Sequence, residues 1–113
     1  MPPRAVELLK GTLDLLILRA LDTGSTHGFG VMRWIERATG ETLRVEEGSL
    51  YPALYRLEDR GWVVSDWGVS ENNRRARFYR LTPKGRAQLK TEADDFTRFA
   101  EAVFKALRTP VAA

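Results

Sequence analysis

Apolar residues recur with helical spacing in four segments of the chain, which predicts helices over residues 4–22, 29–39, 49–60 and 83–108. From Leu13 to Leu21 the first segment is apolar on nearly every side, which is typical of a helix in the protein interior. Gly11 is expected to mark a break or bend in it, and residues 22–28, rich in Gly, Ser and Thr, to form a turn. In the second helix the side chains expected to point inward are Phe29, Val31, Met32 and Ile35, with Gly40 ending the helix.

The third helical segment has two distinct faces. Its apolar face gathers Leu50, Ala53, Leu54 and Leu57, and its opposite face gathers Tyr51, Pro52, Tyr55, Arg56 and Asp59. We expect Ser49 to be the N-cap and Pro52 to lie in the first turn, where a missing N–H has no helical partner to lose. One face therefore packs on the core, while the other presents aromatic and basic groups.

Residues 62–68 and 76–81 have the pattern of two strands, and the polar stretch "VSENNRR" between them predicts a β-hairpin. Arg74 and Arg75 then lie near the tip. We expect Tyr79 and Leu81 to point toward the core from the returning strand, because they alternate with Phe78 and Arg80.

The last helical segment starts at "TPKG", with Thr82 as its expected N-cap and Pro83 as its first residue. Its apolar positions repeat at spacings of 4, 3, 4, 3 and 4, the heptad pattern of a coiled coil. The predicted dimer interface consists of Leu89, Ala93, Phe96, Phe99, Ala100, Val103 and Leu107, with Phe104 beside it. This seam extends about 27 Å at 1.5 Å per residue, longer than so small a core covers, so self-association is expected. The alternative is a helix folded back onto its own domain.

Charge is distributed unevenly along the 113 residues. The net charge is +3, yet seven of the 18 Lys and Arg lie between Arg74 and Lys90, and Asn72–Thr91 contains no Asp or Glu. A basic patch on an otherwise acidic body indicates a polyanionic partner at one surface, although a solvated charged strand is the alternative.

Several classes of protein are disfavoured by composition. The chain has no cysteine and a single histidine, His27, so we expect no disulfide, no metal site, no cofactor and no enzymatic activity. His27 fits a turn or capping role. The most apolar run, "LDLLILRAL", contains Asp14 and Arg19, and the N-terminus lacks the apolar core of a signal peptide, so no membrane partner and a cytoplasmic location are expected.

These elements predict a mainly α fold with a small β-hairpin: a winged helix-turn-helix with an appended C-terminal dimerisation helix. Residues 1–82 would form the DNA-binding domain, and residues 83–113 the dimerisation helix and tail. The third helix would enter the major groove through Ser49, Tyr51, Pro52, Tyr55 and Arg56, with Arg56 the main candidate for a bidentate guanine contact. The hairpin, or wing, would reach phosphates through Asn72, Asn73, Arg74, Arg75 and Arg77.

Four stretches carry a specific resemblance: "KGTLDLLILRAL", "HGFG", "VEEGSLYPALYRLEDRGW" and "WGVSENNRRARFYRLTPKGR". Together they resemble the PadR family of transcriptional regulators, from about Leu8 to Gln88. The resemblance implies winged-helix dimers, mostly repressors, with a recognition helix over 49–60 and a wing over 69–77. The short C-terminal part resembles the subfamily with a single C-terminal helix, in which residues 4–10 often join the dimer interface. Phe29 departs from the Tyr of many members, which removes a hydroxyl there.

The resemblance also implies that a small aromatic effector can bind near the dimer interface, where Trp34, Phe96 and Phe99 are candidate pocket residues; an ordinary core role is the alternative. The expected function is a sequence-specific, DNA-binding transcriptional regulator. Its expected form is a homodimeric repressor on a near-palindromic double-stranded operator. The alternative is a winged-helix module that binds another protein and not DNA.

Overall fold

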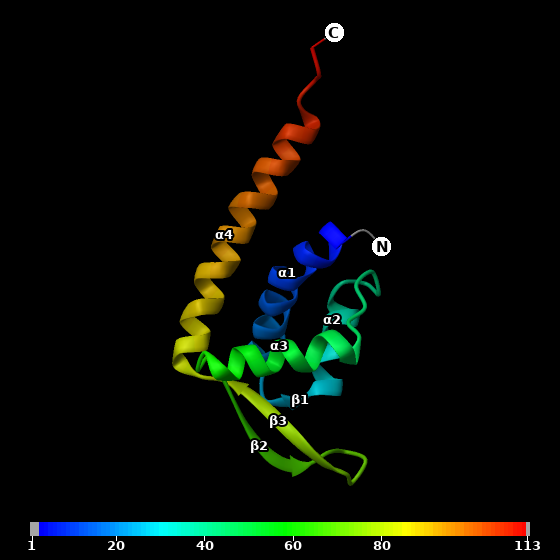
Figure 1. The fold of residues 1–113 in the computed structure, drawn as a ribbon, viewed down its shortest axis with the longest axis vertical. Helices are drawn as coiled ribbons and strands as arrows, with labels where there is room; N and C mark the ends of the chain where they lie inside the picture. Colours follow the sequence, from blue (N-terminus) through cyan, green and yellow to red (C-terminus); the bar gives the residue numbers. More distant parts are fainter. Residues whose placement is uncertain (1–2, 113) are drawn as a thin grey trace.

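The computed structural model describes residues 3–112, with side chains from residue 11 onward, and its architecture is mainly helical (Figure 1). The elements follow in the order α1 (Pro3–Asp22), β1 (Thr26–His27), α2 (Gly28–Ala38), α3 (Glu47–Asp59), β2 (Val63–Val69), β3 (Arg75–Leu81) and α4 (Pro83–Arg108). The strands form one antiparallel sheet in the order β1-β3-β2. This arrangement confirms the winged helix-turn-helix predicted from the sequence. Within the described range, no helix is long and apolar enough to cross a bilayer.

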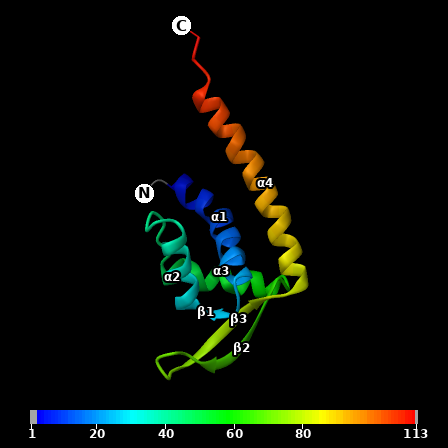
Figure 2. The ribbon, with the colours of Figure 1, turned by 180° about the vertical axis from the view of Figure 1, so that it is seen from behind.

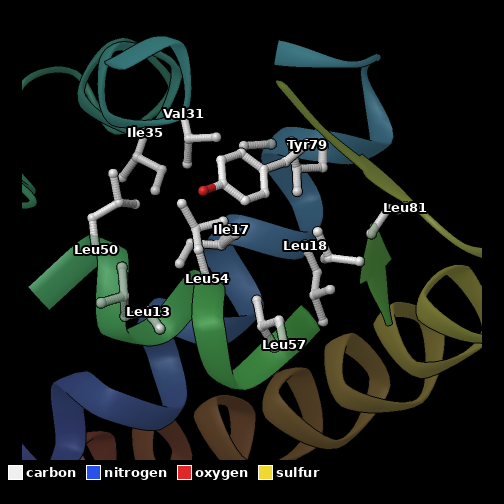
Figure 3. Close-up of a cluster of buried hydrophobic side chains, with 14 of the residues drawn as sticks. Leu13, Ile17, Leu18, Val31, Ile35, Leu50, Leu54, Leu57, Tyr79 and Leu81 are labelled. Carbon is white, nitrogen blue, oxygen red and sulfur yellow. The ribbon is translucent and has the colours of Figure 1, made fainter. Parts of the chain in front are cut away.

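The hydrophobic core lies where α1, α2, α3 and the sheet meet (Figure 3). Its largest fully buried side chains are Ile17, Leu18, Val31, Ile35, Leu50, Leu54, Leu57 and Val63. Tyr79 and Leu81 of β3 are also buried, as their alternation predicts, and burial raises the pKa of the Tyr79 hydroxyl. Full burial of each large aliphatic side chain stabilises the fold by about 1.5–3 kcal/mol. The core therefore holds α3 and the base of the wing to the same body.

Two acidic residues of α1 join this helix to α3 and α4. An oxygen of Asp14 accepts a hydrogen bond from Arg56 Nη2 at 2.8 Å. At the last residue of α1, an oxygen of Asp22 accepts a hydrogen bond from Arg86 Nη1 of α4 at 2.6 Å. The helix itself is continuous through Gly11, so no break occurs there.

The strand β1 is an element that the sequence pattern does not reveal. Thr26 pairs with Tyr79 and His27 with Phe78, at the edge of the sheet away from β2. A two-residue strand is too short to show alternation, which is why a simple turn was expected here. His27 has the capping role predicted for it, because its Nδ1 accepts a hydrogen bond from the Gly30 backbone N–H at 3.0 Å.

The inward orientation predicted for Phe29 is wrong. Its side chain is 54% exposed, whereas Val31 and Ile35 are fully buried. At 100° per residue Phe29 lies on the side of α2 that carries Arg33, whose guanidinium carbon is 5.8 Å from the Phe29 ring centroid. Gly40 follows the helix with a φ of 58°, which confirms the predicted glycine at the C-terminus.

Helix α3 begins two residues before the expected position. Its N-cap is Glu46, not Ser49, and no side chain caps it. The backbone N–H groups of Ser49 and Leu50 both donate to the Glu46 carbonyl, at 3.0 and 2.9 Å. Pro52 therefore lies in the second turn, where it leaves the Gly48 carbonyl without its usual helical donor. The intrinsic capping preference of serine does not set this helix start.

Helix α4 starts at the predicted residue. Thr82 Oγ1 accepts from the Gly85 backbone N–H at 2.9 Å, and the Thr82 N–H donates to the Trp62 carbonyl at 3.0 Å. Pro83 occupies the first turn. Gly85 is buried so tightly that a Cβ built on it would lie 2.8 Å from the carbonyl carbon of Trp62 and nearer still to the oxygen. These contacts fix the base of α4 beside the start of β2.

The C-terminal half of α4 projects beyond the winged-helix domain (Figures 1 and 2). Its first turns lie beside α1, and the rest of the helix continues past the N-terminal end of α1 in both views. The molecule measures 62 × 29 × 24 Å along its principal axes. The wing tip and the far end of α4 lie at opposite ends of the long axis.

Candidate nucleic-acid interface

The outer face of α3 presents most of the side chains that the sequence predicts to meet DNA. Ser49 and Pro52 are exposed, and Tyr55 is 73% exposed. Tyr51 lies at the border of this face, with its ring against the start of α2, where a Cβ on Gly28 would approach its hydroxyl oxygen to 2.6 Å. The hydrogen-bonding and apolar groups of this surface are therefore accessible to a ligand.

Arg56 is held on the α1 side of α3 instead of extending from the outer face. Its ion pair with Asp14 is 2.8 Å long, and the two side chains are 36% and 14% exposed, respectively. A guanidinium in such a pair must leave or share its carboxylate before it can donate two hydrogen bonds to guanine. The guanine contact of Arg56 thus stays a prediction that requires this ion pair to open.

The N-terminus of α3 is acidic. Glu46 and Glu47 are both exposed at the start of the helix. Carboxylates at this position offset the positive end of the helix dipole, and they also repel phosphate. A phosphate near this end of α3 would therefore be favoured by cations from another element.

The wing supplies those cations, beginning at its tip. The Ser70 N–H donates to the Arg74 carbonyl at 2.8 Å, and the Asn73 N–H donates to the Ser70 carbonyl at 2.9 Å. Asn73 has a φ of 58°, a conformation that asparagine tolerates better than most residues. The side chains of Asn72, Asn73, Arg74 and Arg75 are all exposed, so the hairpin tip presents amide and guanidinium donors to solvent.

An exposed tryptophan lies between two arginines of the wing. Trp67 is 59% exposed and pairs in register with Arg77. The guanidinium carbons of Arg75 and Arg77 lie 4.6 and 5.7 Å from its ring centroid. Stacking on an indole orients an arginine while leaving its N–H groups free to donate. Trp67 was not among the sequence-predicted contacts, although alternation from the buried Val63 places it on the same face of the hairpin as these arginines.

Arg77 is also tied to α3. Its Nε donates to Ser65 Oγ at 2.8 Å, and Ser65 Oγ donates to Glu58 Oε2 at 2.6 Å. The Nη2 atom of Arg77 lies 3.8 Å from the same Glu58 oxygen. The charge of Arg77 is therefore partly neutralised within the domain, in contrast to that of Arg74 at the tip.

A cleft of about 530 Å³ separates the wing from the body of the domain. The body contributes His27, Gly28, Phe29, Tyr51 and Tyr79, and the wing contributes Trp67 and the segment from Ser70 to Arg77 without Asn73. One wall is thus rich in guanidinium groups, and the other is aromatic. A cationic wall beside α3 suits a phosphodiester backbone.

Glu71 is an acid in this cleft, and it is hydrogen-bonded. His27 Nδ1 accepts from Gly30, so the proton of the neutral ring is on Nε2, which lies 3.4 Å from Glu71 Oε2. A hydrogen bond to its own backbone N–H, together with the one to His27, holds the pKa of the Glu71 carboxyl below its usual value. The carboxylate is ionised at neutral pH and links the wing tip to the start of α2.

Comparison with known proteins assigns the fold to a family. The model of the transcriptional regulator PadR-like family matches residues 17–91. The chain belongs to the PadR-like family of transcriptional regulators. The resemblance carried by its sequence motifs is therefore confirmed, and its family consists of regulators and not of enzymes.

Relatives of this PadR-like regulator include proteins of known structure. The chain is 37% identical over 83 residues to the transcriptional regulator Rv3488 of Mycobacterium tuberculosis, and the match covers 74% of each protein. A transcriptional regulator from Clostridium thermocellum is 29% identical with a TM-score of 0.78, over 88% of this chain and 96% of that one. Bacillus subtilis PadR, solved in complex with operator DNA, shares the fold at 22% identity and a TM-score of 0.63, over 71% and 46% of the two chains.

The predicted dimer residues of this PadR-like regulator become more exposed toward the end of α4. Leu89 is buried and Ala93 and Ala100 are half-buried, while Phe96, Phe99, Val103, Phe104 and Leu107 are exposed, with Phe99 at 61%. The folded-back alternative requires the protein's own domain to cover the whole seam, but the domain leaves the far half of the seam uncovered. Side chains of residues 4–10, which the resemblance assigns to the dimer interface, lie outside those described.

The three predicted effector residues do not form one site within a chain of this PadR-like regulator. Trp34 packs against the core from α2, whereas Phe96 and Phe99 are exposed on α4. Helix α1 lies between α2 and α4 in both ribbon views (Figures 1 and 2). A pocket that uses all three residues would need side chains from a second chain.

Proposed function

We propose that this PadR-like regulator is a sequence-specific DNA-binding protein of the cytoplasm that acts as a homodimeric repressor at a near-palindromic site. The observation that carries the proposal is the cleft that Tyr51 of α3 shares with Arg74 and Arg75 of the wing. A recognition helix in the major groove and a cationic wing on the adjacent backbone can then engage one duplex together.

The proposed contacts divide into two groups. Ser49, Pro52 and Tyr55, with Tyr51 at the edge, meet base edges and thymine methyl groups, because they form the accessible face of α3. Asn72, Asn73, Arg74 and Arg75 meet phosphates, because they are exposed donors on the wing. Arg77 of the wing and Arg56 on the α1 side of α3 are each already paired with a carboxylate, so we assign them a smaller direct share.

The exposed apolar face of α4 supports the proposed homodimer. Five large apolar side chains lie uncovered between Phe96 and Leu107, at heptad spacing or beside it. A second copy of α4 buries such a seam by knobs-into-holes packing. Two-fold symmetry then presents two recognition helices to two half-sites, which is why the proposed site is near-palindromic.

An effector response is part of the same proposal. Since α1 separates Trp34 from Phe96 and Phe99, a small aromatic compound would bind between two chains, where α4 of one copy approaches its partner. Binding there would change the angle between the two DNA-binding domains. Titration of the dimer with planar aromatic compounds, followed by tryptophan fluorescence, tests this part separately.

Selection of bound sequences from a random duplex pool tests the main proposal. We expect an enriched inverted repeat and an affinity that falls steeply with salt, with a slope that reflects about 6–10 phosphate contacts per dimer. The alternative, a module that binds protein only, predicts no binding to any duplex at low salt. Enrichment of single half-sites without symmetry would contradict the proposed dimer while leaving DNA binding in place.

A further inference from the structure

An acid lies inside the contact between the recognition helix and the wing. Glu58 is on α3, one turn after Leu54, and its side chain is 33% exposed. Its Oε2 atom accepts the 2.6 Å hydrogen bond from Ser65 of β2 and faces Arg77 of β3 at 3.8 Å. Negative charge beside a DNA-binding surface opposes binding unless it has another effect.

The other effect of Glu58 is on the orientation of the wing arginines. The Arg77 guanidinium is held by two contacts: its Nε donates to the Ser65 hydroxyl, and its Nη2 lies near the Glu58 carboxylate. Its guanidinium carbon then lies 5.7 Å from the Trp67 ring centroid, and that of Arg75 lies 4.6 Å from the same centroid. A continuous series of contacts therefore runs from α3 to the exposed arginines of the wing.

Holding these groups in place before DNA arrives reduces the entropy lost on binding. A free arginine side chain samples many rotamers, and ordering them opposes association. The series also fixes the wing relative to α3, since Ser65 lies on β2, Arg77 on β3 and Glu58 on the helix. Charge repulsion and preorganisation thus have opposite signs, and an experiment can decide which is larger.

We propose that Glu58 is a positioning residue for DNA binding, which fixes Arg77, Trp67 and the wing against the recognition helix so that an acid increases DNA affinity. The inference rests on the proposed function and adds a residue to it. Glu58 does not touch DNA in this scheme; it acts through Ser65 and Arg77.

The neighbouring acid, Asp59, provides a matched control. It is exposed on the outer face of α3, and no ion pair or hydrogen bond of its carboxylate is found among the described residues. Glu58→Ala and Asp59→Ala each remove one negative charge from adjacent positions of one helix. A pure charge effect strengthens DNA binding in both variants, by up to about fivefold.

The experiment measures the dissociation constant for the selected duplex by fluorescence anisotropy at fixed salt, with thermal unfolding of each variant as a check on the fold. We expect the dissociation constant of Glu58→Ala to be at least about fivefold higher than that of the wild type. The dissociation constant of Asp59→Ala should be equal to that of the wild type or lower. Ser65→Ala, which changes no charge, should also weaken binding. Equal or tighter binding by folded Glu58→Ala overturns the proposal.

A double substitution tests whether Glu58 acts through Arg77. In the Arg77→Ala background, Glu58→Ala should produce little further loss, because the group that it positions is gone. Additive losses contradict the proposed route. If the wild type itself binds no duplex, the proposed function is rejected as well. If the wild type binds and the affinity of Glu58→Ala is unchanged, only the positioning role is rejected.

Discussion

Replacement of Gly85 by alanine tests how α4 is attached to the winged-helix domain. The added Cβ would lie 2.8 Å from the carbonyl carbon of Trp62, whereas carbon atoms in ordinary contact are about 3.5–4.0 Å apart. The obstacle is backbone and cannot rotate away. The Trp62 carbonyl oxygen would lie closer still, so this peptide must shift by roughly 1 Å or more, and its oxygen is the acceptor for the Thr82 N–H that starts α4.

The expected loss of stability follows from three contributions. Overpacking costs about 1–3 kcal/mol, and weakening the Thr82–Trp62 hydrogen bond costs about 0.5–1.5 kcal/mol. The better helix propensity of alanine returns about 0.8–1 kcal/mol. We therefore expect Gly85→Ala to lower the free energy of unfolding by about 1–3 kcal/mol.

Denaturant unfolding followed by circular dichroism measures this difference, at one protein concentration for all variants because an associating chain is stabilised by mass action. Gly11→Ala is the matched control, since a Cβ there meets no atom within 4 Å. It should raise stability by about 0.5–1 kcal/mol. Unfolding of Gly85→Ala at the same or a higher denaturant concentration than the wild type would contradict the close packing of Gly85 against Trp62.

Three further variants test separate parts of the molecule. The pair Arg74→Ala and Arg75→Ala should weaken binding to all duplexes and reduce the salt slope by about two per chain in a log–log plot of affinity; an unchanged slope would remove the wing from the interface. Asp14→Asn leaves the half-buried Arg56 without its carboxylate and should destabilise the domain by about 0.5–1.5 kcal/mol in thermal unfolding. An unchanged unfolding midpoint would contradict this prediction. Phe99→Glu places a charge on the exposed seam and should give a monomer by light scattering, while a variant that stays dimeric would argue against the proposed interface.

Local sequence signals account for much of the fold. Thr82 and Pro83 mark the start of α4 because both act within one turn. Gly40 ends α2 because glycine readily adopts the positive φ found just after a helix. Tyr79 and Leu81 could be placed in the core by simple alternation. Each of these predictions depends on residues only a few positions apart.

The predictions that failed or were incomplete depend on partners far along the chain. Asp14, 42 positions from Arg56, decides where that guanidinium lies. The strand β1 exists because β3 offers it an edge, and its two residues carry no period of their own. Trp67 was overlooked because its arginine neighbours come from the opposite strand. Base-reading roles need the DNA itself, so Ser49 to Tyr55 stay predicted contacts.

The attachment of α4 at one end gives the molecule a lever. Its 26 residues extend about 39 Å, and the fixed point is the base, where Gly85 meets Trp62 and Arg86 meets Asp22. A tilt of about 10° at that base moves the far end by about 7 Å, a fifth of the roughly 34 Å between half-sites one turn of DNA apart. In the proposed dimer, a sub-ångström change in packing around Trp62 is thus converted into a change of spacing that a DNA duplex can detect.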